Sequence, residues 1–139
     1  MNINYTTNAI YKITMEKTNI KKLFESIDSF DTEGLLSYLD ENAIFRFGNM
    51  PAITGKSQIG PFLDGFFKSI KAIRHDQIEI WEVDNVRIMN GRVTYTRHDG
   101  SELSVPFSNT FKMRGDKIKD YLIFADTSEL YKEAPILQN

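Results

Sequence analysis

The chain has no cysteine among its 139 residues and only two histidines. Disulfide bonds, thiolate nucleophiles and cysteine-ligated metals are therefore excluded, and a structural zinc site is not expected. No apolar run approaches the length of a membrane-spanning helix, and the N-terminus lacks the apolar core of a signal sequence. We therefore expect a cytoplasmic protein with neither a metal ion nor a membrane partner.

Several familiar enzyme motifs are missing as well. The sequence contains no glycine-rich phosphate loop, no His-Glu-x-x-His zinc motif and no Gly-x-Ser-x-Gly nucleophile elbow. Its 17 Lys and Arg residues nearly balance 19 Asp and Glu residues, which gives a net charge of −2. Nucleic-acid-binding proteins usually carry a basic excess instead. The sequence therefore predicts no cofactor and no nucleic-acid partner.

The chain does contain enough apolar residues to form the core of one folded domain. Apolar residues make up 41% of it, with ten Phe and six Tyr, and this composition excludes a disordered chain. The length fits a single domain with one core. We place the domain at residues 15–132, after a polar, Asn- and Thr-rich extension at residues 1–14 and before a C-terminal tail at residues 133–139.

Helical periodicity and capping signals dominate the first half of this domain. Apolar residues spaced i, i+3, i+4 and i+7 predict an amphipathic helix over about residues 16–29. Asp31 is a suitable N-cap for a short second helix, and Gly55 leads into a third helix with one apolar face. Residues 43–47 form a predicted short strand, which the Gly-Asn-Met-Pro sequence at 48–51 ends.

The second half, residues 72–126, has the alternation typical of four β-strands. Three turn signals separate these strands: Asp84-Asn85, Asp99-Gly100 and Arg114-Gly115-Asp116. In the first strand, His75 and Trp81 are predicted to share a face, because an even number of residues separates them. The last strand, from about 117 to 126, is apolar on both faces, so we predict a central position for it in the sheet.

Helices followed by an antiparallel meander indicate an α+β domain. The order and spacing of several segments then carry a family resemblance. These segments are Phe-Asp-Thr-Glu-Gly-Leu-Leu at 30–36, Ala-Ile-Phe-Arg-Phe at 43–47, Gly-Lys-Ser-Gln-Ile at 55–59, Val-Thr-Tyr-Thr-Arg at 93–97, Asp-Lys-Ile-Lys-Asp-Tyr at 116–121 and Phe-Ala-Asp at 124–126. Over residues 16–131 the chain resembles the nuclear transport factor 2-like superfamily, and within it the SnoaL-like, ketosteroid-isomerase-like branch.

The resemblance implies a cystatin-like roll, in which three N-terminal helices pack on the concave face of a cone-shaped, curved antiparallel (mixed) sheet around an apolar pocket. It also implies a homodimer through the outer face of the sheet. For function it implies a cofactor-free acid–base isomerase, cyclase or dehydratase acting on a small apolar carbonyl compound, or else a non-catalytic module that binds a small apolar ligand or a partner protein. Many polyketide-cyclase relatives carry a His-Trp-Asp string on the last strand, whereas this chain has Asp120-Tyr121-Leu122, which weakens the cyclase alternative.

Asp126, Tyr95 and His75 are the candidate catalytic residues. Asp126 closes the last strand, where relatives often carry a pocket Asp, and partial burial would raise its pKa; alternatively it caps a turn by binding local backbone. The Tyr95 hydroxyl could donate to a developing oxyanion or could instead reach the rim of the pocket. His75 could act as a base, or it could lie at the surface where its strand begins.

Six residues are candidates for contacts with a substrate. Arg46 and Arg97 could bind a carboxylate on a ligand, although Arg97 could instead pair with Glu102 across the hairpin. Trp81 could form a wall of the pocket or lie in the core or in a dimer interface. Phe66 belongs to a helical stripe that is mostly core, although one edge of that stripe could line the cavity. Tyr38 could point into the mouth of the pocket, and packing in the core explains it equally well. Phe107, on the strand after the Asp99-Gly100 turn, is the sixth candidate.

Overall fold

The computed structural model describes residues 16–131, so the predicted extension at residues 1–14 and the predicted tail at residues 133–139 lie outside the described residues. The helices are α2 (Lys17–Asp28), α3 (Thr32–Leu36) and α4 (Lys56–Ser69). The strands are β1 (Leu39–Phe47), β2 (Ile53–Thr54), β3 (Ala72–Val83), β4 (Val86–Thr96), β5 (Glu102–Arg114) and β6 (Lys117–Ala125). Within residues 16–131, no helix is both long and apolar enough to cross a lipid bilayer.

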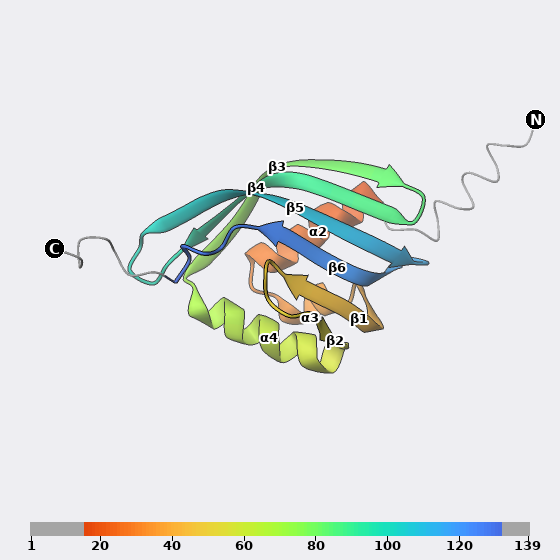
Figure 1. The fold of residues 1–139 in the computed structure, drawn as a ribbon, viewed down its shortest axis with the longest axis horizontal. Helices are drawn as coiled ribbons and strands as arrows, with labels where there is room; N and C mark the ends of the chain where they lie inside the picture. The colour runs from red at the N-terminus through yellow and green to blue at the C-terminus, as the bar shows by residue number, and fades with distance from the viewer. Residues whose placement is uncertain (1–15, 132–139) are drawn as a thin grey trace, which may run out of the picture.

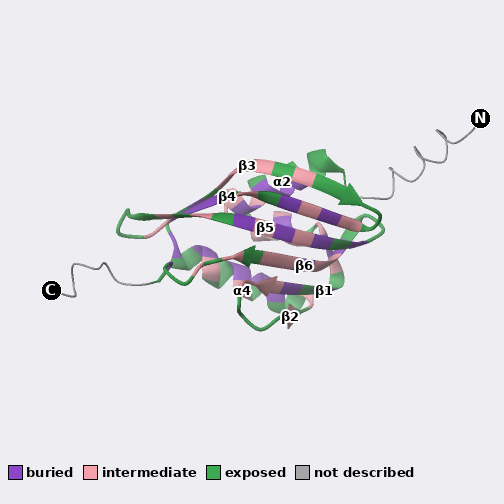
Figure 2. Ribbon diagram, turned by 45° about the horizontal axis from the view of Figure 1, so that its top comes forward, coloured by how far each residue is buried: buried purple, intermediate pink, exposed green. Residues whose placement is uncertain are grey.

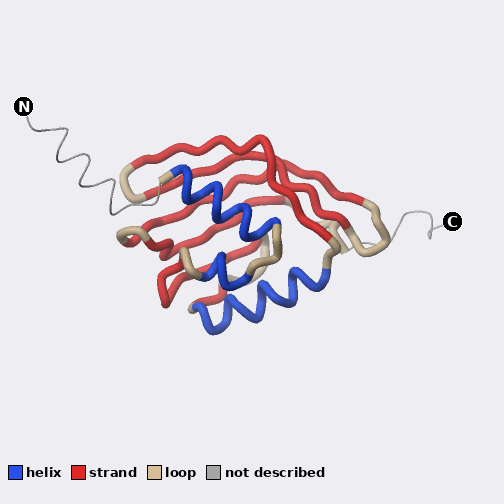
Figure 3. Tube along the Cα trace, turned by 180° about the vertical axis from the view of Figure 1, so that it is seen from behind, coloured by secondary structure: helices blue, strands red, loops and turns tan. Residues whose placement is uncertain are grey.

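The strands form one curved sheet in the order β2-β1-β6-β5-β4-β3 (Figure 1). β1 and β6 run parallel, and all the other neighbouring strands are antiparallel, so the sheet is mixed. β6 lies between β1 and β5, which confirms the central position predicted from its apolar sequence. All three helices lie on the same face of the sheet (Figure 3). The structure thus confirms the predicted α+β class and the cone-shaped curved sheet with helices on its concave face.

Local sequence signals account for the helices. The apolar residues of α2 that the periodicity predicted are all buried: Ile20, Leu23, Phe24 and Ile27. The Asp31 side chain accepts a hydrogen bond from the Gly34 N–H at 2.9 Å, so Asp31 caps α3 as predicted. Gly55 precedes α4 with a φ of 90°, a conformation that glycine adopts without a steric penalty.

A β-bulge interrupts β3 and reverses the faces of the residues that follow it. Asp76 pairs with Arg92, but the next register pair joins Glu79 to Asn90, so β3 carries one extra residue between these pairs. Gln77 in this interval has a φ of 55°. The prediction that His75 and Trp81 share a face is therefore wrong, because strict alternation does not continue through a bulge.

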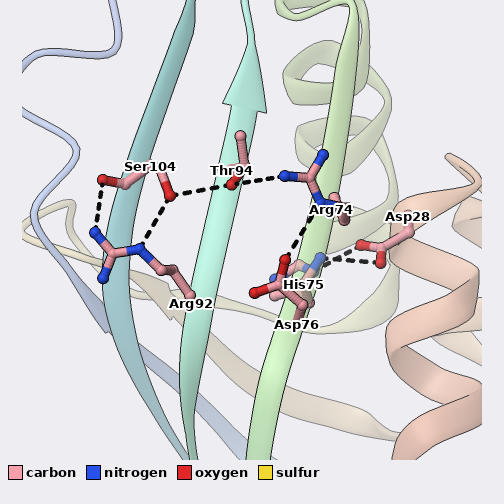
Figure 4. Close-up of polar contacts among 7 residues, drawn as sticks. All are labelled: Asp28, Arg74, His75, Asp76, Arg92, Thr94 and Ser104. Atoms are coloured by element: carbon pink, nitrogen blue, oxygen red, sulfur yellow. Dashed lines mark hydrogen bonds and ion pairs between the residues drawn. The ribbon is translucent and has the colours of Figure 1, made fainter.

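The two faces of the sheet differ in character. The face under the helices carries the core, and buried residues alternate with exposed ones along the strands (Figure 2). The opposite, outer face carries a row of hydrogen-bonded polar side chains across β3, β4 and β5 (Figure 4). In this row the Thr94 hydroxyl lies 3.1 Å from the Ser104 hydroxyl and accepts from Arg74 at 3.4 Å. The concave face is therefore the place where an apolar cavity can form.

Candidate active site

A cavity lies between the concave face of the sheet and the helices. Six phenylalanines contribute to its walls: Phe45, Phe47, Phe62, Phe66, Phe67 and Phe107. Its volume is about 40 Å³, counted as the space that the centre of a water molecule can occupy. This space holds one or a few water molecules, because a single water needs at least about 10–15 Å³ by this measure. A ring-sized ligand would therefore have to displace some of these side chains.

His75 brings a basic nitrogen to this cavity and is oriented by a carboxylate from α2. The ring atom Nδ1 of His75 lies 2.6 Å from Oδ1 of Asp28, and the backbone N–H of His75 donates to Oδ2 at 3.0 Å (Figure 4). An ionised carboxylate only accepts hydrogen bonds, so Nδ1 is the donor in this contact, and in the neutral form of the imidazole Nε2 carries the free lone pair. The side chain of His75 is 9% exposed, and its ring lines the cavity.

Aromatic packing fixes the position of the imidazole. The ring centroid of His75 lies 4.8 Å from that of Phe24 and 5.2 Å from that of Phe107, which meets it edge to face. Asp28 is the last residue of α2, where the helix dipole disfavours a negative charge. The hydrogen bonds to His75 offset this penalty, so the pair both holds α2 against β3 and aligns the imidazole ring.

Two residues that line the cavity carry a buried polar atom without a hydrogen-bond partner among the described residues. The side-chain Oδ1 of Asn109 and the hydroxyl of Tyr121 are buried and make no hydrogen bond within residues 16–131. Both residues line the cavity from neighbouring strands, β5 and β6. Burial, the nearby Asp28 carboxylate and Tyr95 together raise the pKa of Tyr121 far above the usual tyrosine value. The Tyr121 hydroxyl thus stays protonated, so it can donate a hydrogen bond to a ligand.

Tyr95 also lines the cavity and is almost completely buried. Its ring meets that of Phe66 edge to face, at 6.2 Å between centroids. Burial, with a smaller contribution from Tyr131, raises the pKa of Tyr95 well above its ordinary value. Its phenol is therefore also a neutral group in this site.

The structure brings together four of the residues named from the sequence. His75, Tyr95, Phe66 and Phe107 all line the cavity. Asp126 does not, because it lies exposed in the turn after β6 and its Oδ1 accepts a hydrogen bond from the Ser128 N–H at 3.0 Å. This arrangement matches the turn cap that was the alternative for Asp126.

The remaining four candidates lie away from the cavity. Arg46 packs on the outer face, with its guanidinium carbon 5.3 Å from the ring centroid of Phe124. Trp81 is 45% exposed beyond the β3 bulge, and Tyr38 packs against the edge of the core. Arg97 donates to the Leu130 carbonyl rather than pairing with Glu102. These four side chains therefore do not line the cavity.

Three residues of this site were not among the candidates. Asn109 had a visible signal, because it is a polar residue on the otherwise apolar inward face of β5. Tyr121 stands in the apolar run of β6, where nothing distinguishes it from a core residue. Asp28 closes an amphipathic helix 47 residues before His75, and no local pattern joins them. No group of three or more His, Asp or Glu residues that could hold a metal ion occurs in the described part of the chain.

The buried tyrosines lead to a prediction about alkaline pH. An exposed tyrosine has a pKa of about 10. Tyr95 and Tyr121 hold their protons more tightly in the folded state, so the free energy of unfolding falls above about pH 10, by about 1.4 kcal/mol per pH unit for each. We expect Tyr95 and Tyr121 to ionise only as the protein unfolds. In an alkaline titration, the absorbance change from these two tyrosines should therefore coincide with the loss of circular dichroism. Ionisation of all six tyrosines in the folded protein would contradict this.

Comparisons with known proteins agree with this geometry. The family model of the SnoaL-like domain matches residues 20–121. A putative polyketide cyclase from Xanthomonas campestris pv. campestris superposes with a TM-score of 0.75 at 16% identity, over 81% of this chain and 91% of that one. An NTF2-like protein of unknown function from Burkholderia pseudomallei gives a TM-score of 0.74 at 15% identity, over 81% and 92%.

A third similar structure contains a ligand. TerC, co-crystallised with polyporic acid, superposes with a TM-score of 0.72 at 19% identity, over 82% of this chain and 93% of TerC. A search of curated proteins found no match. The structural likenesses establish the nuclear transport factor 2-like fold, and the family model covers most of the described residues. The chain therefore belongs to the SnoaL-like domain family.

Proposed function

We propose that this protein is a cofactor-free acid–base catalyst that moves a proton on a small, neutral, aromatic or polycyclic carbonyl compound. The observation that carries the proposal is the part-buried pair of His75 and Asp28, joined at 2.6 Å, with the imidazole lining a largely aromatic cavity. General bases in enzymes are most often histidines whose tautomer a carboxylate fixes. Asp28 would also stabilise the imidazolium that forms when Nε2 accepts a proton.

The proposed reaction uses the two unpartnered polar groups as well. Nε2 of His75 removes a proton from the carbon beside the carbonyl group, and the electrons of that C–H bond form an enolate. The Tyr121 hydroxyl donates to the enolate oxygen, and Oδ1 of Asn109 accepts from a hydroxyl group of the substrate. If a C=C bond adjoins the enolate, its electrons shift along the conjugated system and His75 returns the proton to the far carbon of that C=C bond, which completes an isomerisation. If the substrate carries a hydroxyl group on the β-carbon, the enolate electrons instead form a new C=C bond, the C–O bond breaks and His75 gives the proton to the leaving hydroxyl group, which departs as water.

The lining supports the proposed substrate class. Among the described residues, no lysine, arginine, aspartate or glutamate lines the cavity, so His75 is the one ionisable side chain besides tyrosine that a ligand would meet there. The six phenylalanine rings offer flat apolar surfaces that suit aromatic rings. The likeness to a putative polyketide cyclase and to TerC, crystallised with polyporic acid, is consistent with such a substrate. The homodimer through the outer face of the sheet stays a prediction.

Hydrogen exchange on a ketone tests the proposal before the natural substrate is known. The probe is β-tetralone, a bicyclic ketone whose protons beside the carbonyl exchange readily. In heavy water, proton NMR should show faster loss of these signals with the protein than with buffer alone. If the melting temperature rises with the ketone but exchange is not accelerated, the ligand is bound without chemistry. That result would favour the non-catalytic ligand-binding alternative.

A further inference from the structure

A groove on the surface lies next to the cavity, between α4 and the segment that follows β6. Its volume is about 550 Å³, compared with about 40 Å³ for the cavity. Met50, Pro61 and Gly65 form part of its apolar lining, and Tyr131 contributes from the far side. The Tyr131 hydroxyl lies 2.7 Å from the Ser69 hydroxyl, and none of the described residues that line the groove is charged.

The groove and the cavity share a wall of three aromatic rings. Phe47, Phe62 and Phe66 line both spaces. The ring centroid of Phe66 lies 5.1 Å from that of Phe47 and 6.5 Å from that of Phe62, whose ring is nearly parallel to it. Phe62 and Phe66 are only intermediately buried, so one side of each ring faces the groove. Movement of these rings would join the two spaces.

Gly65 keeps the groove open where a side chain would narrow it. Glycine inside a helix destabilises the helix relative to alanine, so a reason for it is usually found in packing. Gly60, in the same helix, has such a reason, because a Cβ there would lie 3.3 Å from the Leu36 side chain. A Cβ on Gly65 would meet no atom of residues 16–131 within 4 Å. No close contact within the described residues therefore requires glycine at this position.

We propose that the groove is the outer half of the ligand site and holds the second ring of an elongated, neutral aryl ketone whose carbonyl group reaches His75. This inference rests on the proposed function for the position of the carbonyl group. The inner cavity admits even one ring only if side chains move, so a second ring needs further space, and the groove continues from the cavity across shared aromatic side chains. Its apolar, uncharged lining suits an aromatic ring, and the glycine at position 65 leaves space for it.

Two ketones that differ by one ring test the proposal. Acetophenone carries one ring, and para-phenylacetophenone adds a second in line with the carbonyl group. By titration calorimetry on the full chain, the longer ketone should bind wild type at least roughly tenfold more tightly, because the second ring buries additional apolar area. The Gly65→Leu variant should lose that advantage and keep its affinity for acetophenone. Lys68→Leu, an exposed change on α4 outside the groove, should keep both affinities.

The smaller change Gly65→Ala gives an independent measurement. Without ligand, it should raise the melting temperature by about 2 to 5 °C, because alanine favours the helix and its Cβ meets none of the described residues. It should also weaken binding of para-phenylacetophenone relative to acetophenone. A lower melting temperature in Gly65→Ala would mean that another part of the chain already fills the groove, and would overturn the proposal.

Other results would also overturn it. Equal affinities of wild type for the two ketones, or an unchanged ratio in Gly65→Leu, would exclude the second-ring site. A change of sedimenting mass in Gly65→Leu would instead identify the groove as a contact between two copies of the chain. All these measurements report binding or assembly and not turnover. The ratio of the two ketone affinities could depend on Gly65 while the wild-type protein fails to exchange β-tetralone protons. In that case the proposed function fails and the second-ring site stands.

Discussion

Replacing His75 with glutamine is expected to slow proton exchange of β-tetralone by about a hundredfold to ten-thousandfold, the range that a positioned general base contributes. Glutamine is polar and similar in length, so its amide can still donate a hydrogen bond to Asp28. It has no basic lone pair, and Nε2 is the atom that the proposed reaction needs. Exchange rates from proton NMR in heavy water, measured on both proteins at the same pH, give the ratio directly.

The chain supplies matched controls for this change. His98, the other histidine, lies on the surface with Nε2 2.8 Å from the Lys68 carbonyl oxygen, so His98→Gln should exchange protons as wild type does. Asp126→Asn should also retain exchange, because Asp126 binds the turn outside the cavity. If Asp126→Asn lost activity and His75→Gln kept it, the base would be the carboxylate first considered from the sequence. Melting temperatures of all three variants would show whether any loss comes from unfolding.

The fold was largely predictable because its signals are local and repeated. The helical period around Ile20, the capping side chain of Asp31 and the strand alternation after residue 72 each specify an element without reference to distant parts of the chain. The apolar sequence of β6 also predicted its central position in the sheet. These signals sum over many residues, so an error at one position leaves the architecture unchanged.

The site was less predictable because it depends on single contacts between distant elements. His75 was a candidate, but its partner Asp28 comes from α2, and only the packing of α2 on β3 brings the two together. The β3 bulge changed the face on which Trp81 lies, and Gln77 gives no sequence signal for it. Asn109 could have been found, because one polar residue on an apolar strand face already suggests a buried polar site.

The β3 bulge also explains the glycine at position 91. Replacing Gly91 is the second substitution for which we expect a large effect. Gly91 lies on β4 opposite Phe107, at the point where β3 carries its extra residue. A Cβ on Gly91 would lie 2.8 Å from Cε1 of Phe107 and 2.9 Å from the carbonyl oxygen of Asp76. Real Cβ atoms do not approach other atoms this closely, and the Asp76 carbonyl belongs to the paired backbone, so the strand itself would have to shift.

Gly91→Ala is therefore expected to lower the free energy of unfolding by about 1–3 kcal/mol, the usual penalty for overpacking a well-packed core. Urea unfolding followed by circular dichroism measures this change. Gly65→Ala makes the same chemical change at a position where a Cβ meets no atom in the described part of the chain, and it should act in the opposite direction. Equal effects of the two substitutions would mean that the glycines act only through their backbone freedom and that the contact with Phe107 is unimportant.

The same substitution should also affect catalysis, because Phe107 touches both Gly91 and the imidazole. The ring of Phe107 stands at 90° to that of His75, with 5.2 Å between centroids, and a Cβ at position 91 would push this ring away from β4. The imidazole would then lose one of its two aromatic supports, while its hydrogen bond to Asp28 could remain. We expect Gly91→Ala, assayed at a temperature where it is fully folded, to slow β-tetralone exchange, though by less than His75→Gln. An unchanged exchange rate in a destabilised Gly91→Ala protein would show that Asp28 alone positions the base.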